Sequence, residues 1–202
     1  MSHSDTVRDV KIRGELVFGR KEGEMQIKIN KAILELVEGD ITKQETDAIV
    51  NAANPTLLGG GGVDGAIHRA AGPELLAESR TLGGCETGDA KITKGYRLKA
   101  RHVIHTVGPV YRRDGAQAPA LLASAYRRSL EVASENHLKS IAFPSISTGA
   151  YGYPLNEAAL IALKTVRDYL KKHPDINLVR FALFDQNTLK AYEEALKKLT
   201  VY

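Results

Sequence analysis

The chain of 202 residues contains one cysteine, and it has no hydrophobic run approaching the roughly 18 residues that cross a bilayer. A single cysteine cannot form an internal disulfide, which excludes a disulfide-held scaffold and fits a reducing compartment. No base is identifiable near this residue, Cys85, and we expect a buried or unreactive thiol. The first 24 residues contain no apolar segment of the signal type and mix acidic with basic residues, unlike a transit peptide. We therefore expect a cytoplasmic protein without a membrane partner.

Aromatic residues are also few, at 6% of the chain, and the formal net charge is a mild +4. A nucleic-acid platform normally gathers basic residues on one face and adds stacking rings. The basic pairs here are isolated, with acids between them, which favours solvated helix surface. These pairs are Arg112-Arg113, Arg127-Arg128, Lys171-Lys172 and Lys197-Lys198. Nucleic acid is thus a disfavoured partner, whereas a small anionic ligand is compatible with this charge.

The length predicts one domain with an extension. A chain of this size buries roughly 70% of its unfolded surface, so its core needs neither a metal nor a disulfide. Residues 1–24 are polar, and we expect them to form an extension, either a vector remnant or an added edge strand over Val10–Phe18. The domain proper covers residues 25–202.

From Met25 onward, β-rich runs alternate with helical patterns. The expected strands are Met25–Ile29, Ile33–Val37, Asp47–Ala52, Ala90–Thr93, His102–Val107, Ser140–Pro144 and Leu178–Phe184. Apolar residues recur at spacings of three and four over 122–133, over 160–170, where Asn156 is the expected N-cap, and over 189–199. The alternation predicts a three-layer α/β/α sandwich around a mixed, mostly parallel sheet with antiparallel early strands at one edge.

Ligands of such sheets bind beyond the carboxyl ends of the strands, and the most unusual segment of the chain follows one of these ends. Asn51–Gly65 reads Asn-Ala-Ala-Asn-Pro-Thr-Leu-Leu, then four glycines, then Val-Asp-Gly, before a short helix expected around Ala66–Ala71. Ordering this backbone costs about 1–2 kcal/mol per residue, which suits positive φ or close approach to a ligand. Amides that lead into a helix favour phosphate. The alternative is a flexible surface loop.

Two further loops follow strand ends. Ser145–Pro154 supplies hydroxyls, glycine amides and the Tyr151 ring, which suit a second phosphate and a sugar. Its alternative is an ordinary strand-to-helix connection. In Gly39–Thr42, Asp40 is either an acceptor for an exocyclic amine or a turn residue.

Neither standard nucleotide motif fits these loops. Gly60, Gly62 and Gly65 satisfy G-x-G-x-x-G, but Asn51–Leu58 separate them from a strand that is not the first. Gly83–Gly88 has the glycine spacing of a P-loop, yet an aspartate stands where the lysine should be.

Six motifs occur in a fixed order along the chain. They are Gly-Asp-Ile-Thr at 39–42, Asn-Ala-Ala-Asn at 51–54, the glycine stretch with Val-Asp-Gly at 59–65, Ile-His-Arg-Ala-Ala-Gly-Pro at 67–73, His-Thr-Val-Gly-Pro at 105–109 and Ser-Thr-Gly at 147–149. Together they resemble a macro domain, and more narrowly the MacroD-type branch of ADP-ribose hydrolases, over about residues 25–202. The resemblance implies an α/β/α fold that binds ADP-ribose, hydrolyses mono-ADP-ribose esters on acidic side chains and deacetylates O-acetyl-ADP-ribose. The ester is already labile, so no metal or other cofactor is required.

Matching positions carry the family's roles onto this chain. Asp40 would bind the adenine amine beside the Ile41 backbone, and Phe184 would stack near adenine. Asn54 would hold the distal ribose, and Asp64 would be the catalytic carboxylate that deprotonates water. The residues expected around the diphosphate and distal ribose are Gly61, Gly62, Val63, Ser147, Thr148, Gly149, Ala150 and Tyr151. Ala150 departs from the pattern, since a larger aliphatic is frequent there.

These polar residues have structural alternatives. Asp64 could instead cap its helix, for about 1 kcal/mol, and Asn54 could tie its own loop. His68, one turn beyond Asp64, could face it as an acid–base group or simply pack. His102 and His105 fall on opposite faces of a strand, so they cannot share a metal.

The sequence therefore predicts a hydrolase of ADP-ribose conjugates, with ADP-ribose, its esters and mono-ADP-ribosylated proteins as partners. Two other classes stay open: a reader that binds ADP-ribose without turnover, and an RNA-binding or regulatory module that uses the same site. The carboxylate at position 64 favours the enzyme, because a reader needs none there.

Overall fold

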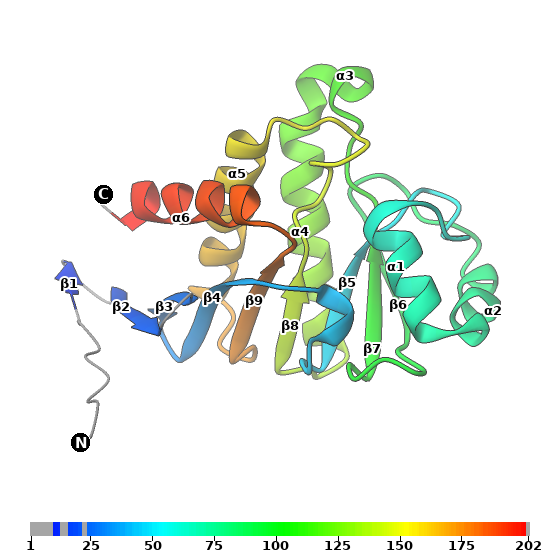
Figure 1. Cartoon of the computed structure of the whole chain (residues 1–202), viewed down its shortest axis with the longest axis horizontal. Coiled ribbons are helices and arrows are strands. Elements are labelled where there is room, and N and C mark those ends of the chain that lie inside the picture. The colour runs from blue at the N-terminus through cyan, green and yellow to red at the C-terminus, as the bar shows by residue number, and fades with distance from the viewer. Residues whose placement is uncertain (1–9, 13–15, 22–23, 201–202) are drawn as a thin grey trace.

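A single mixed β-sheet forms the middle layer of the protein (Figure 1). The computed structural model describes residues 10–12, 16–21 and 24–200, and within them the strand order is β1-β2-β3-β4-β9-β8-β5-β7-β6. The strands are β1 Val10–Ile12, β2 Leu16–Lys21, β3 Glu24–Ile29, β4 Ala32–Glu38, β5 Ala48–Ala52, β6 Ala90–Lys94, β7 His102–Thr106, β8 Ser140–Phe143 and β9 Leu178–Leu183.

Parallel pairs join the five central strands, β4, β9, β8, β5 and β7, and antiparallel pairs flank them on both sides. Every strand expected from residue 25 onward is present, with ends that differ by at most one residue. The three-layer fold with a mixed sheet and antiparallel early strands is confirmed. Antiparallel β6 at the other edge was not expected.

Two strands fall within the predicted extension. β1 pairs antiparallel with β2, and β2 pairs antiparallel with β3, with Phe18 opposite Ile27. The sheet thus continues into this segment. The domain boundary at residue 24 stays a prediction, and residues 1–9, 13–15 and 22–23 lie outside the described residues.

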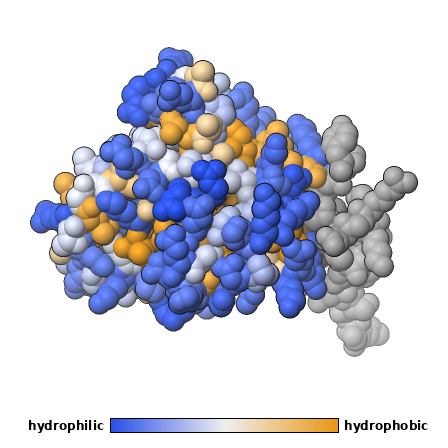
Figure 2. All heavy atoms as spheres, turned by 180° about the vertical axis from the view of Figure 1, so that it is seen from behind, coloured by the Kyte–Doolittle hydropathy of each residue, from blue (hydrophilic) through white to orange (hydrophobic). Residues whose placement is uncertain are grey.

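Helices cover both faces of the sheet. They are η1 Ile41–Lys43, α1 Gly62–Ala71, α2 Pro73–Thr81, α3 Tyr111–Asp114, η2 Gly115–Gln117, α4 Ala118–Glu135, α5 Leu155–Leu170 and α6 Gln186–Thr200. The larger core lies where α4, α5 and α6 meet one face, and a smaller core lies between α1, α2 and the other face. Seen from behind, the surface is mostly hydrophilic, with smaller hydrophobic patches (Figure 2). No helix in the described part of the chain is long and apolar enough to cross a membrane.

Two helix starts differ from expectation. α1 begins at Gly62, four residues before the expected start. The sequence did not predict this first turn because it carries two glycines and shows no apolar spacing. α5 begins at Leu155 with Pro154 as N-cap, so the expected cap at Asn156 is wrong. The apolar stripe of α5 also differs, since Leu160 is exposed and its neighbour Ala159 is buried.

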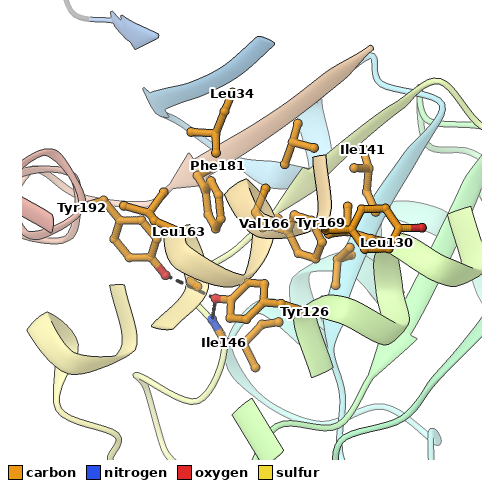
Figure 3. Packing of buried hydrophobic residues seen from close by; sticks show 14 of the residues in the cluster. Leu34, Tyr126, Leu130, Ile141, Ile146, Leu163, Val166, Tyr169, Phe181 and Tyr192 are labelled. Atoms are coloured by element: carbon orange, nitrogen blue, oxygen red, sulfur yellow. Dashed lines mark hydrogen bonds between the residues drawn. The ribbon is translucent and has the colours of Figure 1, made fainter. Parts of the chain in front are cut away.

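An aromatic cluster in the larger core supports the loop that follows β8 (Figure 3). The rings of Tyr126, Phe143, Phe181 and Tyr192 pack together, with Tyr126 and Phe143 centred 5.2 Å apart. The Tyr126 hydroxyl accepts the N–H of Ile146 at 3.0 Å and lies 3.2 Å from the Tyr192 hydroxyl. The chain just past β8 is therefore fixed to the core by buried hydrogen bonds.

Candidate active site

Three loops follow the carboxyl ends of central strands, and Figure 1 shows those after β5, β7 and β8 at the same end of the sheet. The parallel register places Asn51 of β5 directly beside His105 of β7. Because side chains alternate along a strand, both point toward the face that α1 covers. Both are fully buried.

Asp64 lies in the first turn of α1, directly over Asn51. Its carboxylate is 4% exposed and accepts a hydrogen bond from Nδ2 of Asn51 at 2.7 Å. The same Nδ2 lies 3.1 Å from Nδ1 of His105. Nε2 of His68 lies 3.4 Å from Oδ1 of Asp64 without forming a hydrogen bond. His68 therefore adjoins Asp64, and its acid–base role stays a prediction.

Burial decides the protonation of this cluster. It raises the pKa of Asp64, although the bond from Asn51 and the nearby His68 oppose the rise. Burial also lowers the pKa of His105 to about 3, and His68 adds to that effect. Asp64 is thus a more basic carboxylate than an exposed one, and the His105 ring is neutral at physiological pH.

Asp64 does not cap its helix. The N-cap of α1 is Gly61, and no side-chain capping bond forms. Oδ2 of Asp64 is buried and has no hydrogen-bond partner in the described structure. The capping alternative for this aspartate is therefore wrong.

The five glycines at positions 59–62 and 65 differ in the reason why each is needed. A Cβ at Gly60 would lie 3.0 Å from Oδ2 of Asp64, and a Cβ at Gly65 would lie 2.5 Å from the Gly60 carbonyl oxygen. Gly59 and Gly62 have φ of +86° and +56°. Gly61 has φ of −94° and open space where a Cβ would stand. Steric contacts or a positive φ within the protein therefore require glycine at each of these positions except 61.

Asn54 ties its own loop, as its structural alternative predicts. Nδ2 donates to the Gly59 carbonyl at 2.9 Å, and Oδ1 accepts from the N–H and hydroxyl of Thr56. A primary amide has a second N–H, so these bonds leave a donor for a ligand. The role of Asn54 at the ribose stays a prediction.

The loop after β8 carries strain. Ser147 has φ of +66°, is buried, and its Oγ has no hydrogen-bond partner in the described structure. This loop meets the loop after β7, since a Cβ at Gly108 would lie 2.2 Å from that Oγ. Non-glycine residues at positive φ are uncommon and cluster at functional sites.

The remaining residues expected in this loop are half-buried or exposed. Thr148 donates to Oγ of Ser145, and Gly149 and Ala150 are exposed. Burial raises the pKa of Tyr151, Arg113 lowers it and the charge of Asp64 raises it. Tyr151 thus lies within electrostatic reach of Asp64, which brings the loops after β5 and β8 together.

The expected adenine-binding residues follow the neighbouring strands β4 and β9. Asp40 is exposed, and its Oδ1 accepts from the N–H and hydroxyl of Thr42, which makes it the N-cap of η1. Ile41 is buried, whereas Phe184 is 83% exposed. The N–H of Gly39 donates to the Leu183 carbonyl, so both loops start side by side. Contacts of these residues with adenine stay a prediction.

Sequence reasoning did not assign a role to Asn51, and it considered His105 only as a metal ligand. The signal was present: each is a polar residue inside an apolar strand, Ala-Ile-Val-Asn-Ala and His-Val-Ile-His-Thr. Cys85 is buried, as expected, and burial raises its pKa to about 11.

The fold and the site define an α/β/α ligand-binding domain with a buried carboxylate beside glycine-rich and hydroxyl-rich loops. Residues 50–162 match the macro domain model, and the chain belongs to the macro domain family. It is 54% identical to the ADP-ribose glycohydrolase MACROD2 of Xenopus laevis, over 88% of this chain and 44% of that protein. It is 52% identical to the O-acetyl-ADP-ribose deacetylase of Cronobacter turicensis, over 81% of this chain and 95% of that protein. The macrodomain of Trypanosoma brucei in complex with ADP-ribose has a TM-score of 0.76 and 49% identity, over 81% of this chain and 68% of that one.

Proposed function

We propose that this protein is a hydrolase that binds ADP-ribose, cleaves mono-ADP-ribose esters from acidic side chains and deacetylates O-acetyl-ADP-ribose. The observation that carries the proposal is the buried Asp64 carboxylate, oriented by Asn51 next to the glycine-rich N-terminus of α1. The relatives named for these two activities support it. Mono-ADP-ribosylated proteins in the cytoplasm are the proposed partners.

The diphosphate binds between the loops after β5 and β8. The first amides of α1, at Gly62 and Val63, follow a glycine cap without a side chain, so anionic oxygens can approach them closely. The open Cβ position of Gly61 faces no protein atom within 4 Å, and close ligand approach explains that glycine. The loop Ser147–Tyr151 encloses the diphosphate from the other side, with the Tyr151 ring over the distal ribose.

Asp64 acts as the general base. Its Oδ2 has no partner among the described residues and accepts a proton from water, while Oδ1 stays fixed by Asn51. The oxygen of that water forms a new bond to the ester, and one ester C–O bond breaks. Asp64 then gives the proton to the departing oxygen, so that the carboxylic acid and ADP-ribose leave and the carboxylate is regenerated. A raised pKa favours this step, because a base is most effective when its pKa approaches the working pH.

The remaining predicted residues recognise the ends of the ligand. Asn54 holds the distal ribose through its second N–H, Asp40 accepts from the adenine amine beside the Ile41 backbone, and the exposed Phe184 ring stacks on adenine. An exposed aromatic ring at a strand end is suited to this, since it gains contact area only when a base covers it.

Three measurements on one preparation separate the three classes. Calorimetry with free ADP-ribose should detect binding, and a glutamate-modified protein should release free ADP-ribose. Binding without release would support a reader instead. Salt-dependent RNA binding that ADP-ribose displaces would support the RNA-binding class. Absence of heat at millimolar ADP-ribose, on folded protein, would overturn the proposal, and ¹⁸O-labelled water would identify the bond that breaks.

A further inference from the structure

A chain of buried polar groups continues beneath Asp64 into the sheet. Asp64 contacts Asn51 on β5, Asn51 contacts His105 on β7, and Nε2 of His105 lies 2.9 Å from Oγ1 of Thr93 on β6. Each of the four residues is at most 4% exposed. Thr93 and His105 belong to no predicted ligand contact, although their polar atoms line up behind the carboxylate.

The proton positions along this chain follow from its ends. A carboxylate can only accept, so the amide nitrogen of Asn51 faces Asp64. The second N–H of that nitrogen points to Nδ1 of His105, which therefore accepts and carries no proton. The neutral ring then holds its single proton on Nε2, and this N–H donates to Thr93. Oγ1 of Thr93 donates onward to the Lys94 carbonyl at 3.2 Å.

Each alternative arrangement places like atoms against each other. A flipped Asn51 amide would bring its oxygen to 2.7 Å from the carboxylate oxygen. The other tautomer of His105 would direct a second N–H at Nδ2 of Asn51, 3.1 Å away. Water does not reach these buried atoms to relieve either clash, so a mismatch is costly.

We propose that His105 is a positioning residue: in its Nε2–H tautomer, whose N–H Thr93 accepts, it fixes the Asn51 amide and thereby keeps the Asp64 carboxylate ionised and aimed at the substrate. The proposal rests on the proposed function for its consequence in turnover, whereas the tautomer itself belongs to the ligand-free protein.

Other ionisable groups border this chain and must be followed in its test. His68 of α1 is centred 6.2 Å from His105 and also adjoins Asp64. Lys91 of β6 stands opposite His105, but its ammonium donates to the Leu82 carbonyl at 2.7 Å. In the loop after β8, burial raises the pKa of Tyr151, and the charge of Asp64 adds to that rise. Of these, His68 adjoins both Asp64 and His105, so it requires a separate control.

The first test is ¹⁵N NMR of histidine-labelled, ligand-free protein between about pH 5 and pH 8. The His105 signals are assigned by their loss in His105→Asn, and those of His68 by their loss in His68→Asn. We expect His105 to remain a neutral Nε2–H ring throughout this range. A proton on Nδ1, or protonation near pH 6, overturns the proposal without reference to any activity.

The second test compares Thr93→Val with Thr93→Ser in the release of ADP-ribose. The valine has a similar shape but accepts no hydrogen bond, so it leaves the Nε2–H of His105 without an acceptor, whereas the serine keeps the hydroxyl. Because Asn51 then holds the ionised carboxylate less well, the acid limb of the kcat profile should move up by about one pH unit in Thr93→Val. KM should stay the same, and Thr93→Ser should restore the profile of the wild type.

A purely structural Thr93 would lower Tm in Thr93→Val and leave the pH limb in place, which overturns the proposal. If the wild type releases no ADP-ribose, the proposed function fails, and ¹³C titration of the Asp64 carboxyl in the same variants replaces the kinetic profile. An Asp64 titration that is equal in Thr93→Val and Thr93→Ser then overturns the positioning role.

Discussion

Two buried polar clusters lie at the same end of the sheet, and they differ in how completely their hydrogen bonds are made. Around Tyr126, the hydroxyls of both tyrosines, the Ser145 hydroxyl and the Ile146 N–H all find partners. Around Asp64, three buried atoms have none: Oδ1 of Asn51, Oδ2 of Asp64 and Nε2 of His68. They are half of the six such side-chain atoms in the described part of the protein.

This difference separates support from chemistry. A satisfied buried network makes one arrangement of the chain stable, and here it fixes the start of the loop after β8. Unsatisfied buried groups reduce the free energy of unfolding, and proteins keep them where a ligand or reaction uses them. We therefore expect changes near Asp64 to act on turnover and changes near Tyr126 to act on stability.

The largest expected effect is on turnover in Asp64→Ala. Loss of a general base should lower kcat by roughly 10²–10⁴, with ADP-ribose binding within a few-fold of the wild type. Tm should hardly move, because Asp64 does not cap α1 and its ionised form is disfavoured by burial. Hydrolysis and thermal unfolding measured on the same preparation check this.

Asp47 provides the matched control at the opposite end of β5. Burial raises its pKa, but hydrogen bonds from the N–H groups of Lys139 and Ser140 and from Arg101 outweigh this and lower it. Asp47→Ala should thus lower stability by about 1–3 kcal/mol and leave kcat of the folded fraction unchanged. A large kcat loss in Asp47→Ala, or unfolding of Asp64→Ala, would contradict the division.

The next effect is on the pH dependence of stability. The pKa of His105 falls from 6.5 to about 3 on folding, so the unfolded chain binds a proton that the native protein does not. The free energy of unfolding therefore has its full value above pH 6.5 and decreases as the pH falls. The decrease is about 1.4 kcal/mol per pH unit, or about 2 kcal/mol between pH 7 and pH 5. Urea unfolding of the wild type and His105→Asn at both pH values measures the difference, since asparagine does not titrate.

Asp64 contributes with the opposite sign. Its raised pKa gives stability that is complete below 3.8 and is lost as the pH rises through the folded value. Because His105→Asn also changes the contact that fixes the Asn51 amide, the comparison is repeated in an Asp64→Ala background, which removes this contribution. An equal loss of stability on acidification in the wild type and His105→Asn would mean that another group controls the acid limit.

The sequence predicted the cluster around Tyr126 better than the cluster around Asp64. Periodic apolar residues located α4 and α6, and β-rich runs located the strands, because burial imposes spacing on the chain. The contact between Asn51 and His105 depends instead on which strands are neighbours and in what register. Local sequence does not encode that register, so the two residues were visible only as polar residues within apolar runs.

The start of α1 shows the same limit. Gly62–Gly65 lacks the spacing and the propensity of a helix, yet tertiary packing imposes the helix there. The glycine-rich stretch 59–65 indicated close backbone approach, and the structure separates two causes: Gly65 packs against protein, and Gly61 faces open space.

A smaller effect should separate these two glycines. Gly65→Ala places its Cβ 2.5 Å from the Gly60 carbonyl oxygen, which should cost about 1–3 kcal/mol of stability. Gly61→Ala meets no protein atom and has an ordinary φ, so stability should stay within about 0.5 kcal/mol. ADP-ribose affinity should nonetheless fall in Gly61→Ala, as calorimetry can measure. Unchanged affinity there would remove the ligand-based reason for that glycine.

The smallest expected effect is the loss of one hydroxyl in Tyr126→Phe. It leaves the buried Ile146 N–H without its partner, which should lower the free energy of unfolding by about 1–2 kcal/mol. Tyr169→Phe is the matched control, because that hydroxyl bonds to Ser134 in a part-buried position where water can replace it. We expect it to lower the free energy of unfolding by less than about 1 kcal/mol.

Because Ile146 starts the loop that encloses the diphosphate, Tyr126→Phe should also raise KM for the ester slightly while kcat stays the same. A loss of kcat in folded Tyr126→Phe would show that the two clusters act as one unit, since the hydroxyl contacts none of the groups that we place at the reacting bond.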